Sequence, residues 1–368
     1  MSDRIFSLDA ALSRRQPALP EGVSAVRILL VDDDPAVRKT LVDGINAIAG
    51  ASICGEASDS EDAFDLLVRA RPDLIVMRAD LPGMSGLQVT RSVMVRQPTP
   101  IIVTADLATP DPEIAFESLR SGALALIPRP ASAAAGRDLA ARIVACARLA
   151  GASASNLVEI PDAPGVPVAP RLITLVAGDG ALGPAMRLFD DLPRLTAPLL
   201  LATSIDSAFF PAFVSWLSDL IPQGAIAAIQ SNGGPLSSGP VHVLPAGTIA
   251  TITPEAGVSV ITGLSGPGNI STFDLLLTTM AETLGAASAA VLFGHIGTGG
   301  ASGLLALQKT GSRTLAEFPA ACPFAQAPGL ARRIGAAEFC GSASELAAYL
   351  RDLVTPPDTS PPAAGPMS

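Results

Sequence analysis

Short apolar runs alternate with helix-like segments along most of the chain. Runs rich in Val, Ile and Leu, such as 28–31, 74–77 and 172–176, precede stretches in which apolar residues recur every three or four positions. Continuous apolar runs of this kind are typical of strands buried on both faces of a parallel sheet. The pattern predicts an α/β protein built from two doubly wound parallel sheets.

Changes in composition divide the repeating units into two blocks. We expect an N-terminal arm over 1–25, a first domain over 26–150, a linker rich in Pro, Ala, Gly and Ser over 151–170, a second domain over 171–354, and a disordered tail over 355–368. A length of 368 residues suits two domains that each bury a core of their own.

The overall charge argues against nucleic acid as a partner. Lys and Arg total 24 against 34 Asp and Glu, a formal net charge of −10, so no basic field attracts phosphate backbones or anionic membranes. The cysteines are widely separated and form neither a zinc motif nor a disulfide framework. With no export signal visible, these features predict a cytoplasmic protein with reduced cysteines. The cysteines are Cys54, Cys146, Cys322 and Cys340.

The stretch between Glu282 and Lys309 is free of formal charge and long enough to raise the question of a membrane span. Its centre carries His295, a run of glycines, Thr298 and Ser302. Polar groups at that depth are costly in lipid. The pattern therefore favours a buried strand, a glycine loop and a buried helix, and predicts no membrane span.

Three carboxylates follow the first strand. Asp32, Asp33 and Asp34 come directly after an apolar run, and Pro35 then opens a helix. Capping of that helix explains one of the three acids but not the adjacent pair. Carboxylates at the C-terminal edge of a parallel sheet are suitable ligands for Mg²⁺, so Asp32 and Asp33 are candidate metal ligands.

The first block resembles the receiver domain of two-component response regulators. The resemblance rests on four segments in the right order and spacing, 28–35, 72–87, 100–106 and 121–130. It implies a flavodoxin-like fold, with Asp32 and Asp33 as the family's acidic pocket. The family's phosphoacceptor aspartate stands four residues before Pro82, and this chain has Arg78 there.

Arginine cannot accept a phosphoryl group as an acyl phosphate, but its planar fork can bridge to a carboxylate. We therefore expect Arg78 to pair with Asp32 or Asp33 and to replace Mg²⁺, which would lock the receiver in one conformation. Asp80 is a weak substitute acceptor, because it falls past the strand end. Its other interpretation is a solvated loop acid.

The switch residues of the receiver are only partly retained. Thr104 matches the family's switch hydroxyl, but Arg129 stands in place of the lysine before Pro130, and Leu126 in place of the switch aromatic residue. The resemblance implies Mg²⁺ as a cofactor, which these changes put in doubt.

The second block resembles the catalytic domain of the chemotaxis methylesterase, CheB, which removes methyl esters from receptor glutamates. The segments that carry the likeness are 240–247, 271–277 and, above all, 297–336. The resemblance implies a Rossmann-like domain with a serine, histidine and aspartate at the C-terminal edge of the sheet. In this chain the corresponding positions hold Gly178, Ser204 and Gly299.

All three catalytic roles are therefore unfilled, and loss of such a unit costs roughly a millionfold in kcat. Asp179, Ser204 and His295 lie in loops that should converge, so a rearranged triad remains an alternative. Each also has a structural interpretation, as a helix cap, a strand-end cap and a loop histidine. The glycines around Gly178 and Gly299 are also compatible with a nucleotide-binding turn, although neither run has the full motif spacing.

We therefore predict a CheB-like signalling protein in a two-component or chemotaxis-type pathway, acting through binding as a pseudo-receiver and pseudo-methylesterase. The alternatives are an active, phosphorylation-regulated protein-glutamate methylesterase and a small-ligand or nucleotide sensor. Between Leu220 and Gln308 only Glu255, Asp274 and Glu282 are charged, which suggests a covered surface. The expected partners are chemoreceptors, signalling-array proteins, a histidine kinase or a second copy.

Overall fold

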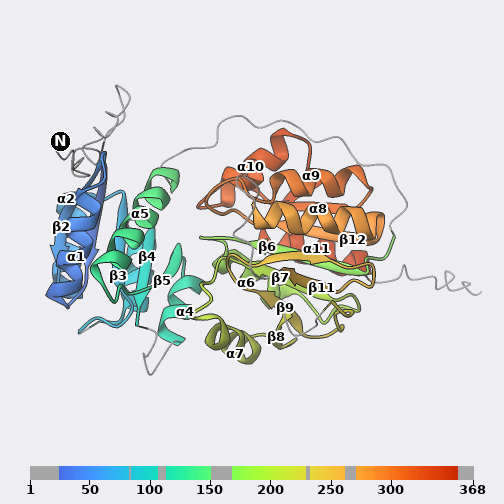
Figure 1. Ribbon diagram of the computed structural model, residues 1–368, viewed down its shortest axis with the longest axis horizontal. Helices are drawn as coiled ribbons and strands as arrows, with labels where there is room; N and C mark the ends of the chain where they lie inside the picture. The colour runs from blue at the N-terminus through green and yellow to red at the C-terminus, as the bar shows by residue number, and fades with distance from the viewer. Residues whose placement is uncertain are drawn as a thin grey trace, which may run out of the picture.

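The computed structural model describes residues 25–82, 84–106, 113–150, 168–228, 233–261 and 271–354. The predicted tail lies outside these residues, as do the predicted arm except for Ala25 and most of the predicted linker. Two α/β units lie side by side, the first coloured blue to green and the second green to red (Figure 1). The predicted fold class is confirmed, since each unit is built on its own parallel sheet.

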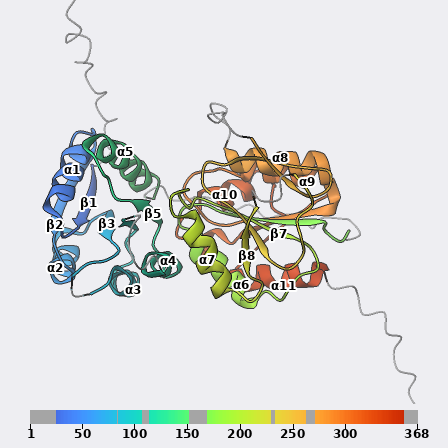
Figure 2. The same cartoon turned by 60° about the horizontal axis from the view of Figure 1, so that its bottom comes forward.

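The first sheet has five parallel strands in the order β2-β1-β3-β4-β5, an order typical of flavodoxin-like folds. Figure 2 shows α1 and α5 on one face of this sheet and α2, α3 and α4 on the other. The strands are β1 (Val26–Val31), β2 (Ala51–Ala57), β3 (Leu74–Arg78), β4 (Ile101–Ala105) and β5 (Ala125–Pro128). The helices are α1 (Pro35–Asn46), α2 (Ser60–Ala70), α3 (Gly86–Arg96), α4 (Glu113–Arg120) and α5 (Ala133–Ala150).

Local sequence explains where several helices of the first unit begin. The Asp34 carboxylate accepts the amides of Ala36 and Val37 at 2.8 and 3.4 Å, which confirms that one of the three acids caps α1. Ser85 and Gln88 form a reciprocal capping box at the start of α3. The caps fix each chain reversal directly after a strand, so the strand ends are held at one edge of the sheet.

The second sheet has seven parallel strands in the order β14-β13-β12-β6-β7-β9-β8, accompanied by the antiparallel hairpin β10-β11. Its strands are β6 (Leu172–Ala177), β7 (Leu199–Thr203), β8 (Ala225–Ala227), β9 (Val241–Leu244), β12 (Ser288–Leu292), β13 (Arg313–Glu317) and β14 (Phe339–Gly341), and the hairpin comprises β10 (Ile249–Ile252) and β11 (Val258–Ile261). The helices are α6 (Leu182–Asp191), α7 (Phe210–Leu220), α8 (Thr272–Leu284), α9 (Ala301–Lys309), α10 (Gln326–Arg333) and α11 (Ala343–Val354), and the short 3-10 turns are η3 (Gly285–Ala287) and η4 (Pro319–Ala321).

The uncharged stretch before Lys309 folds into a buried strand, β12, a glycine loop and the helix α9, as predicted, although α9 is buried on one face only. Within the ranges that the structure describes, none of the helices combines the length and apolar character that crossing a membrane requires.

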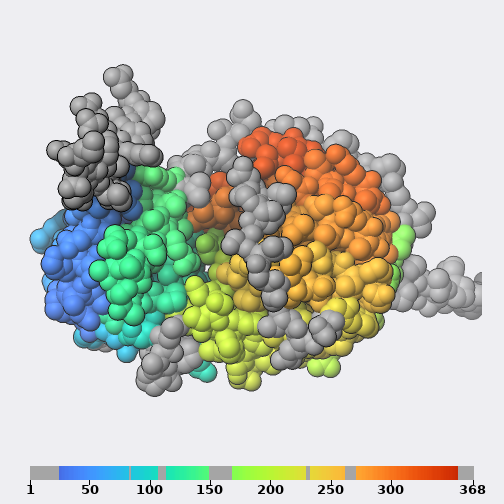
Figure 3. Space-filling view, in the orientation of Figure 1, coloured from blue at the N-terminus to red at the C-terminus, as the bar shows by residue number. Residues whose placement is uncertain are grey.

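The two units share an apolar seam. Phe116 of α4 packs against Phe213 and Trp216 of α7, with ring centroids 5.5 and 5.4 Å apart, and all three side chains are buried. These aromatic residues of α7 therefore belong to a core that is common to both units. Figure 3 shows the green surface of the first unit pressed against the yellow-green surface of the second. The receiver-like unit thus covers part of its neighbour.

Candidate functional site

Each sheet has a topological switch point, which is the place where the order of the strands reverses. In α/β proteins ligands bind in the crevice at the carboxyl ends of the strands there. In the first sheet this point lies between β1 and β3, and in the second between β6 and β12. The predicted site residues cluster at these two places. Asp32 and Arg78 belong to the first, Gly178 and His295 to the second.

Asp32 is the most deeply placed acid of the first site, with 1% of its surface exposed. One oxygen accepts the Asp34 amide at 2.9 Å, and Arg129 grips the carboxylate with its Nη2 at 2.8 Å and its Nε at 3.2 Å. Burial raises the pKa of Asp32, although the Asp34 amide and Arg129 oppose that effect. The family's lysine position is therefore occupied by an arginine that holds the acidic pocket directly.

Arg78 faces the neighbouring acid. Its Nη1 pairs with the Asp33 carboxylate, while its Nη2 lies 3.5 Å from Asp106. Of the two carboxylates that the sequence offered as partners for Arg78, the structure brings Asp33 into contact. Asp32 instead forms an ion pair with Arg129.

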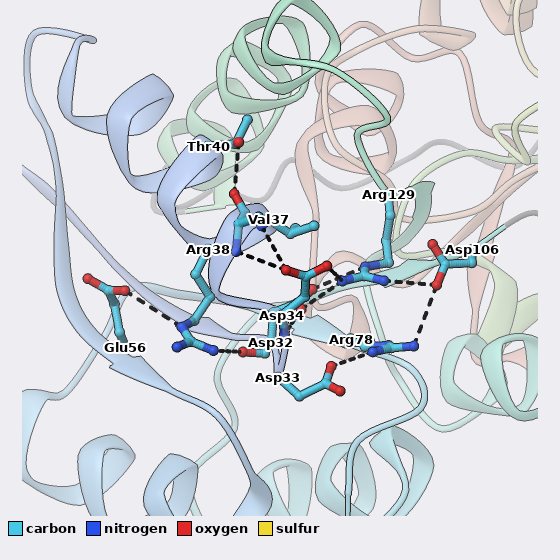
Figure 4. Close-up of polar contacts among 11 residues, drawn as sticks. Asp32, Asp33, Asp34, Val37, Arg38, Thr40, Glu56, Arg78, Asp106 and Arg129 are labelled. Atoms are coloured by element: carbon cyan, nitrogen blue, oxygen red, sulfur yellow. Dashed lines mark hydrogen bonds and ion pairs between the residues drawn. The ribbon is translucent and has the colours of Figure 1, made fainter.

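Asp106 joins the two arginines and was not singled out from the sequence. Its carboxylate lies 2.8 Å from Arg129 Nη1 and also contacts Arg78, so one acid bridges both guanidinium groups (Figure 4). Burial alone would lower the pKa of Arg129, but its hydrogen bonds to Asp106 and Asp32 raise it overall. The only sequence signal for Asp106 was its position, directly after β4 and two residues past Thr104.

The donor set does not suit a divalent cation. The two acids of the pocket each face a guanidinium group, so a cation that used both carboxylates would have to displace both arginines. Among the residues that the structure describes, no cluster of three or more His, Cys, Asp or Glu is arranged to hold a metal ion.

The remaining receiver residues lie where their strands predict. Thr104 is buried at the end of β4, and Leu126 is buried in β5. Asp80 is exposed past the end of β3, as a solvated loop acid would be.

At the second site, the loop after β12 crosses the turn after β6. The Ile296 amide donates to the Asp179 carbonyl at 3.1 Å, and the His295 ring lies against Gly178. A Cβ atom added to Gly178 would stand 2.8 Å from both Cγ and Cδ2 of that ring. The imidazole therefore occupies the space that a side chain at the nucleophile position would need.

His295 is 2% exposed and its Nδ1 lies 2.9 Å from the Phe293 carbonyl. Burial lowers its pKa, so the ring is neutral near pH 7. Its edge packs on Phe273 with centroids 5.6 Å apart. Within the described part of the chain, no hydrogen bond joins it to Asp179 or Ser204, so the three proposed surrogates do not form a triad in this conformation.

Two of those surrogates are neighbours. Burial raises the pKa of the Asp179 carboxyl group, while the neighbouring Ser204 side chain acts in the opposite direction. Both line a hollow closed on its other side by Leu119, Leu124 and Leu126 of the first unit. This hollow has room for about one water molecule.

The third catalytic position, Gly299, faces Ser271 rather than a base. A Cβ added there would lie 2.5 Å from the Ser271 hydroxyl oxygen. Asp274 accepts the Gly303 amide at 2.8 Å, so its carboxylate supports the first turn of α9.

Glu317 is a buried acid that sequence reasoning missed. Its carboxylate accepts the Gly294 amide at 2.9 Å and so holds the loop that carries His295. Burial raises its pKa, opposed by the Gly294 and Cys322 hydrogen bonds. A single Glu inside a strand gave no signal of this role.

Family models match both units. The model described as "Response regulator receiver domain" matches residues 28–141, and the one described as "CheB methylesterase" matches residues 173–350. A protein-glutamate methylesterase/protein-glutamine glutaminase of Anaeromyxobacter dehalogenans is 30% identical over 354 residues, covering 89% of this chain and 99% of the relative. A relative of the same description from Caulobacter vibrioides is 26% identical and covers 90% and 99%.

Two solved structures from Thermotoga maritima match the separate units. The response regulator domain of its CheB is 28% identical and covers 34% of this chain and 94% of that chain, with a TM-score of 0.31. The methylesterase catalytic domain of the same organism's CheB is 18% identical and covers 51% and 100%, with a TM-score of 0.42.

Proposed function

Because the chain belongs to the CheB methylesterase family, with a receiver domain ahead of the methylesterase domain, we propose that it serves chemotaxis-type signalling as a non-catalytic binding protein. The observation that carries the proposal is the contact between Gly178 and the His295 ring. An esterase of this type needs a hydroxyl at that position, activated by a nearby base. Here the position has no side chain, and a neutral ring fills the space.

The receiver supports the same proposal. Arg78 stands at the acceptor position and pairs with Asp33, while Arg129 and Asp106 complete a network of opposite charges. Phosphorylation would need both a carboxylate at position 78 and a bound Mg²⁺. We therefore propose that phosphorylation does not control this receiver, and that its conformation is set by internal ion pairs.

Protein partners follow from the family. We propose chemoreceptors, array proteins or a histidine kinase as the binding partners. The proposed location in the cytoplasm stays a prediction of the sequence.

The decisive experiment measures methanol release from methylated chemoreceptor fragments by the full chain, with and without acetyl phosphate and Mg²⁺. A family member that retains serine, histidine and aspartate is the positive control, and circular dichroism verifies folding. We expect background release from this chain together with measurable binding to the same fragments. Release above background would overturn the proposal.

The shared position of Asp179 and Ser204 in the lining of one hollow favours one alternative, a rearranged hydrolytic site. The variant Ser204→Ala tests it. If the wild-type chain releases methanol or deamidates receptor glutamine and Ser204→Ala does not, the alternative replaces our proposal. Equal background rates in both proteins would support the binding role.

A further inference from the structure

The seam between the two domains has a polar centre beside its apolar part. The Gly180 amide, directly after β6, donates to the Leu124 carbonyl of the receiver at 2.6 Å. A Cβ on Gly180 would collide with Phe324, whose side chain belongs to the receiver's hydrophobic cluster. The β6 turn is therefore clamped between the receiver and the loop before α10.

Asp179 is the acid at this centre. It precedes Gly180 and lines the same hollow as Leu124 and Ser204. On the receiver side, Arg142 of α5 lies close enough for its charge to act on this carboxyl group, and the neutral thiol of Cys146 lies nearby. Closing the seam therefore reduces the contact of this carboxyl group with water, although the residue stays partly exposed.

Among the titratable groups around the seam that are described below, Asp179 is the one whose protonation we expect to change with pH. Arg142 also pairs with Asp206 at 3.7 Å, and its positive charge favours the ionised form of Asp179. The pKa of Cys146 is raised to about 12, so its thiol stays neutral. His295, on the adjoining loop, is neutral because burial lowers its pKa. At the far end of the seam, Arg120 pairs with Asp190 at 3.9 Å.

We propose that closure of the receiver onto the methylesterase-type domain is linked to protonation of Asp179, so that the seam tightens when this carboxyl group is neutral and loosens when it is ionised. The feature depends on the acid that stands directly after Gly178. It would make the exposure of the seam, and of any binding surface within it, responsive to pH.

The direction follows from linkage. Burial in the closed form raises the pKa of Asp179 above its ordinary 3.8, whereas an opened seam would return the group to water. The closed form then binds the proton more tightly. Its advantage is complete below the ordinary pKa and is lost as pH rises through the raised one. Linkage of one proton changes the opening equilibrium by at most about tenfold per pH unit.

The sole tryptophan makes the seam measurable. Trp216 packs on Phe116 of the receiver, so its emission reports whether that contact is made. We would record Trp216 emission of the full chain from pH 4.5 to 8.5, together with hydrogen exchange of the Gly180 amide corrected for the intrinsic rate. We expect red-shifted emission and faster Gly180 exchange as pH rises.

Asp179→Asn should flatten both profiles and leave the seam closed throughout. Glu255→Gln, at an exposed carboxylate of the same domain in the turn between β10 and β11, is the matched control and should keep the wild-type slope. Arg142→Gln removes the nearby positive charge and should move the midpoint to higher pH, which tests the proposal even if Asp179→Asn folds poorly. A flat wild-type profile, or the same slope in Asp179→Asn, would overturn the proposal.

Discussion

The two switch points of this molecule have been closed in different ways. In the receiver, between β1 and β3, arginines stand against carboxylates, and Asp106 ties Arg78 to Arg129. In the second domain, between β6 and β12, the neutral imidazole of His295 packs against Gly178, which has no side chain. The first closure is electrostatic and the second is steric.

The difference between electrostatic and steric closure determines how each site should respond to substitution. A buried charge network is sensitive to the loss of any one member, because the partner is left charged and poorly solvated. A sterically filled site is sensitive instead to added volume, since a packed interior has no room to relax. Opposite changes, removal in one domain and addition in the other, should therefore do comparable damage.

Arg129→Met should have the largest effect. It leaves Asp32 buried without its bidentate partner, and we expect a loss of about 3–5 kcal/mol in the free energy of unfolding at neutral pH. Urea unfolding followed by circular dichroism measures it. Arg91→Met, at an exposed arginine 3.9 Å from Glu117, is the control and should change little. Equal losses in the two variants would contradict an electrostatic closure.

Gly178→Ser restores the family's hydroxyl but forces its Cβ against the His295 ring. We expect a loss of about 1–3 kcal/mol, typical of overpacking. Adding His295→Ala should recover part of that loss, so the double variant should be more stable than the sum of the single changes predicts. Strict additivity of the two substitutions would argue that the ring does not fill this space.

Arg78→Met should cost less than Arg129→Met, about 1 kcal/mol, because both Arg78 and Asp33 are partly exposed and solvent screens their attraction. The companion change Arg78→Asp restores the acceptor carboxylate. With Arg129 still holding Asp32, we expect no saturable response to Mg²⁺ in the receiver's amide chemical shifts. Tight Mg²⁺ binding by the single variant would show that Arg78 alone excludes the metal.

The last expected effect depends on pH and concerns Glu317, whose carboxylate accepts the Gly294 amide. Burial raises its pKa above 4.5, so its ionisation costs stability increasingly as pH rises through the raised value. Relative to wild type, Glu317→Gln should therefore gain stability from pH 5 to pH 8, by at most about 1.4 kcal/mol per pH unit. Glu255→Gln, at an exposed acid, should give a difference independent of pH.

Much of the fold could be predicted because its signals are local. The apolar runs ending at Val31 and Ala177 marked central strands of the two sheets, and Asp34 with Pro35 marked the start of α1. The uncharged stretch around His295 was assigned to strand, loop and helix because its polar centre does not suit lipid. Each of these conclusions needed only neighbouring residues.

The site could be predicted only in part, because long side chains choose among partners that lie far apart in sequence. Two acids were possible partners for Arg78, and only the approach of Arg129 from the end of β5 decides between them. Asp106 and Glu317 carried no motif. The seam was also invisible, since Leu124 and Gly180 meet through tertiary packing alone.

One feature of the seam bears on how this protein unfolds. Phe324 of the second domain is buried within a hydrophobic cluster made otherwise of receiver residues, while Phe116 of the receiver packs among the aromatic side chains of α7. Each domain thus contributes a large side chain to the interior of the other. Separating them would expose apolar surface on both sides, so heating should melt the two sheets in a single cooperative transition rather than in two.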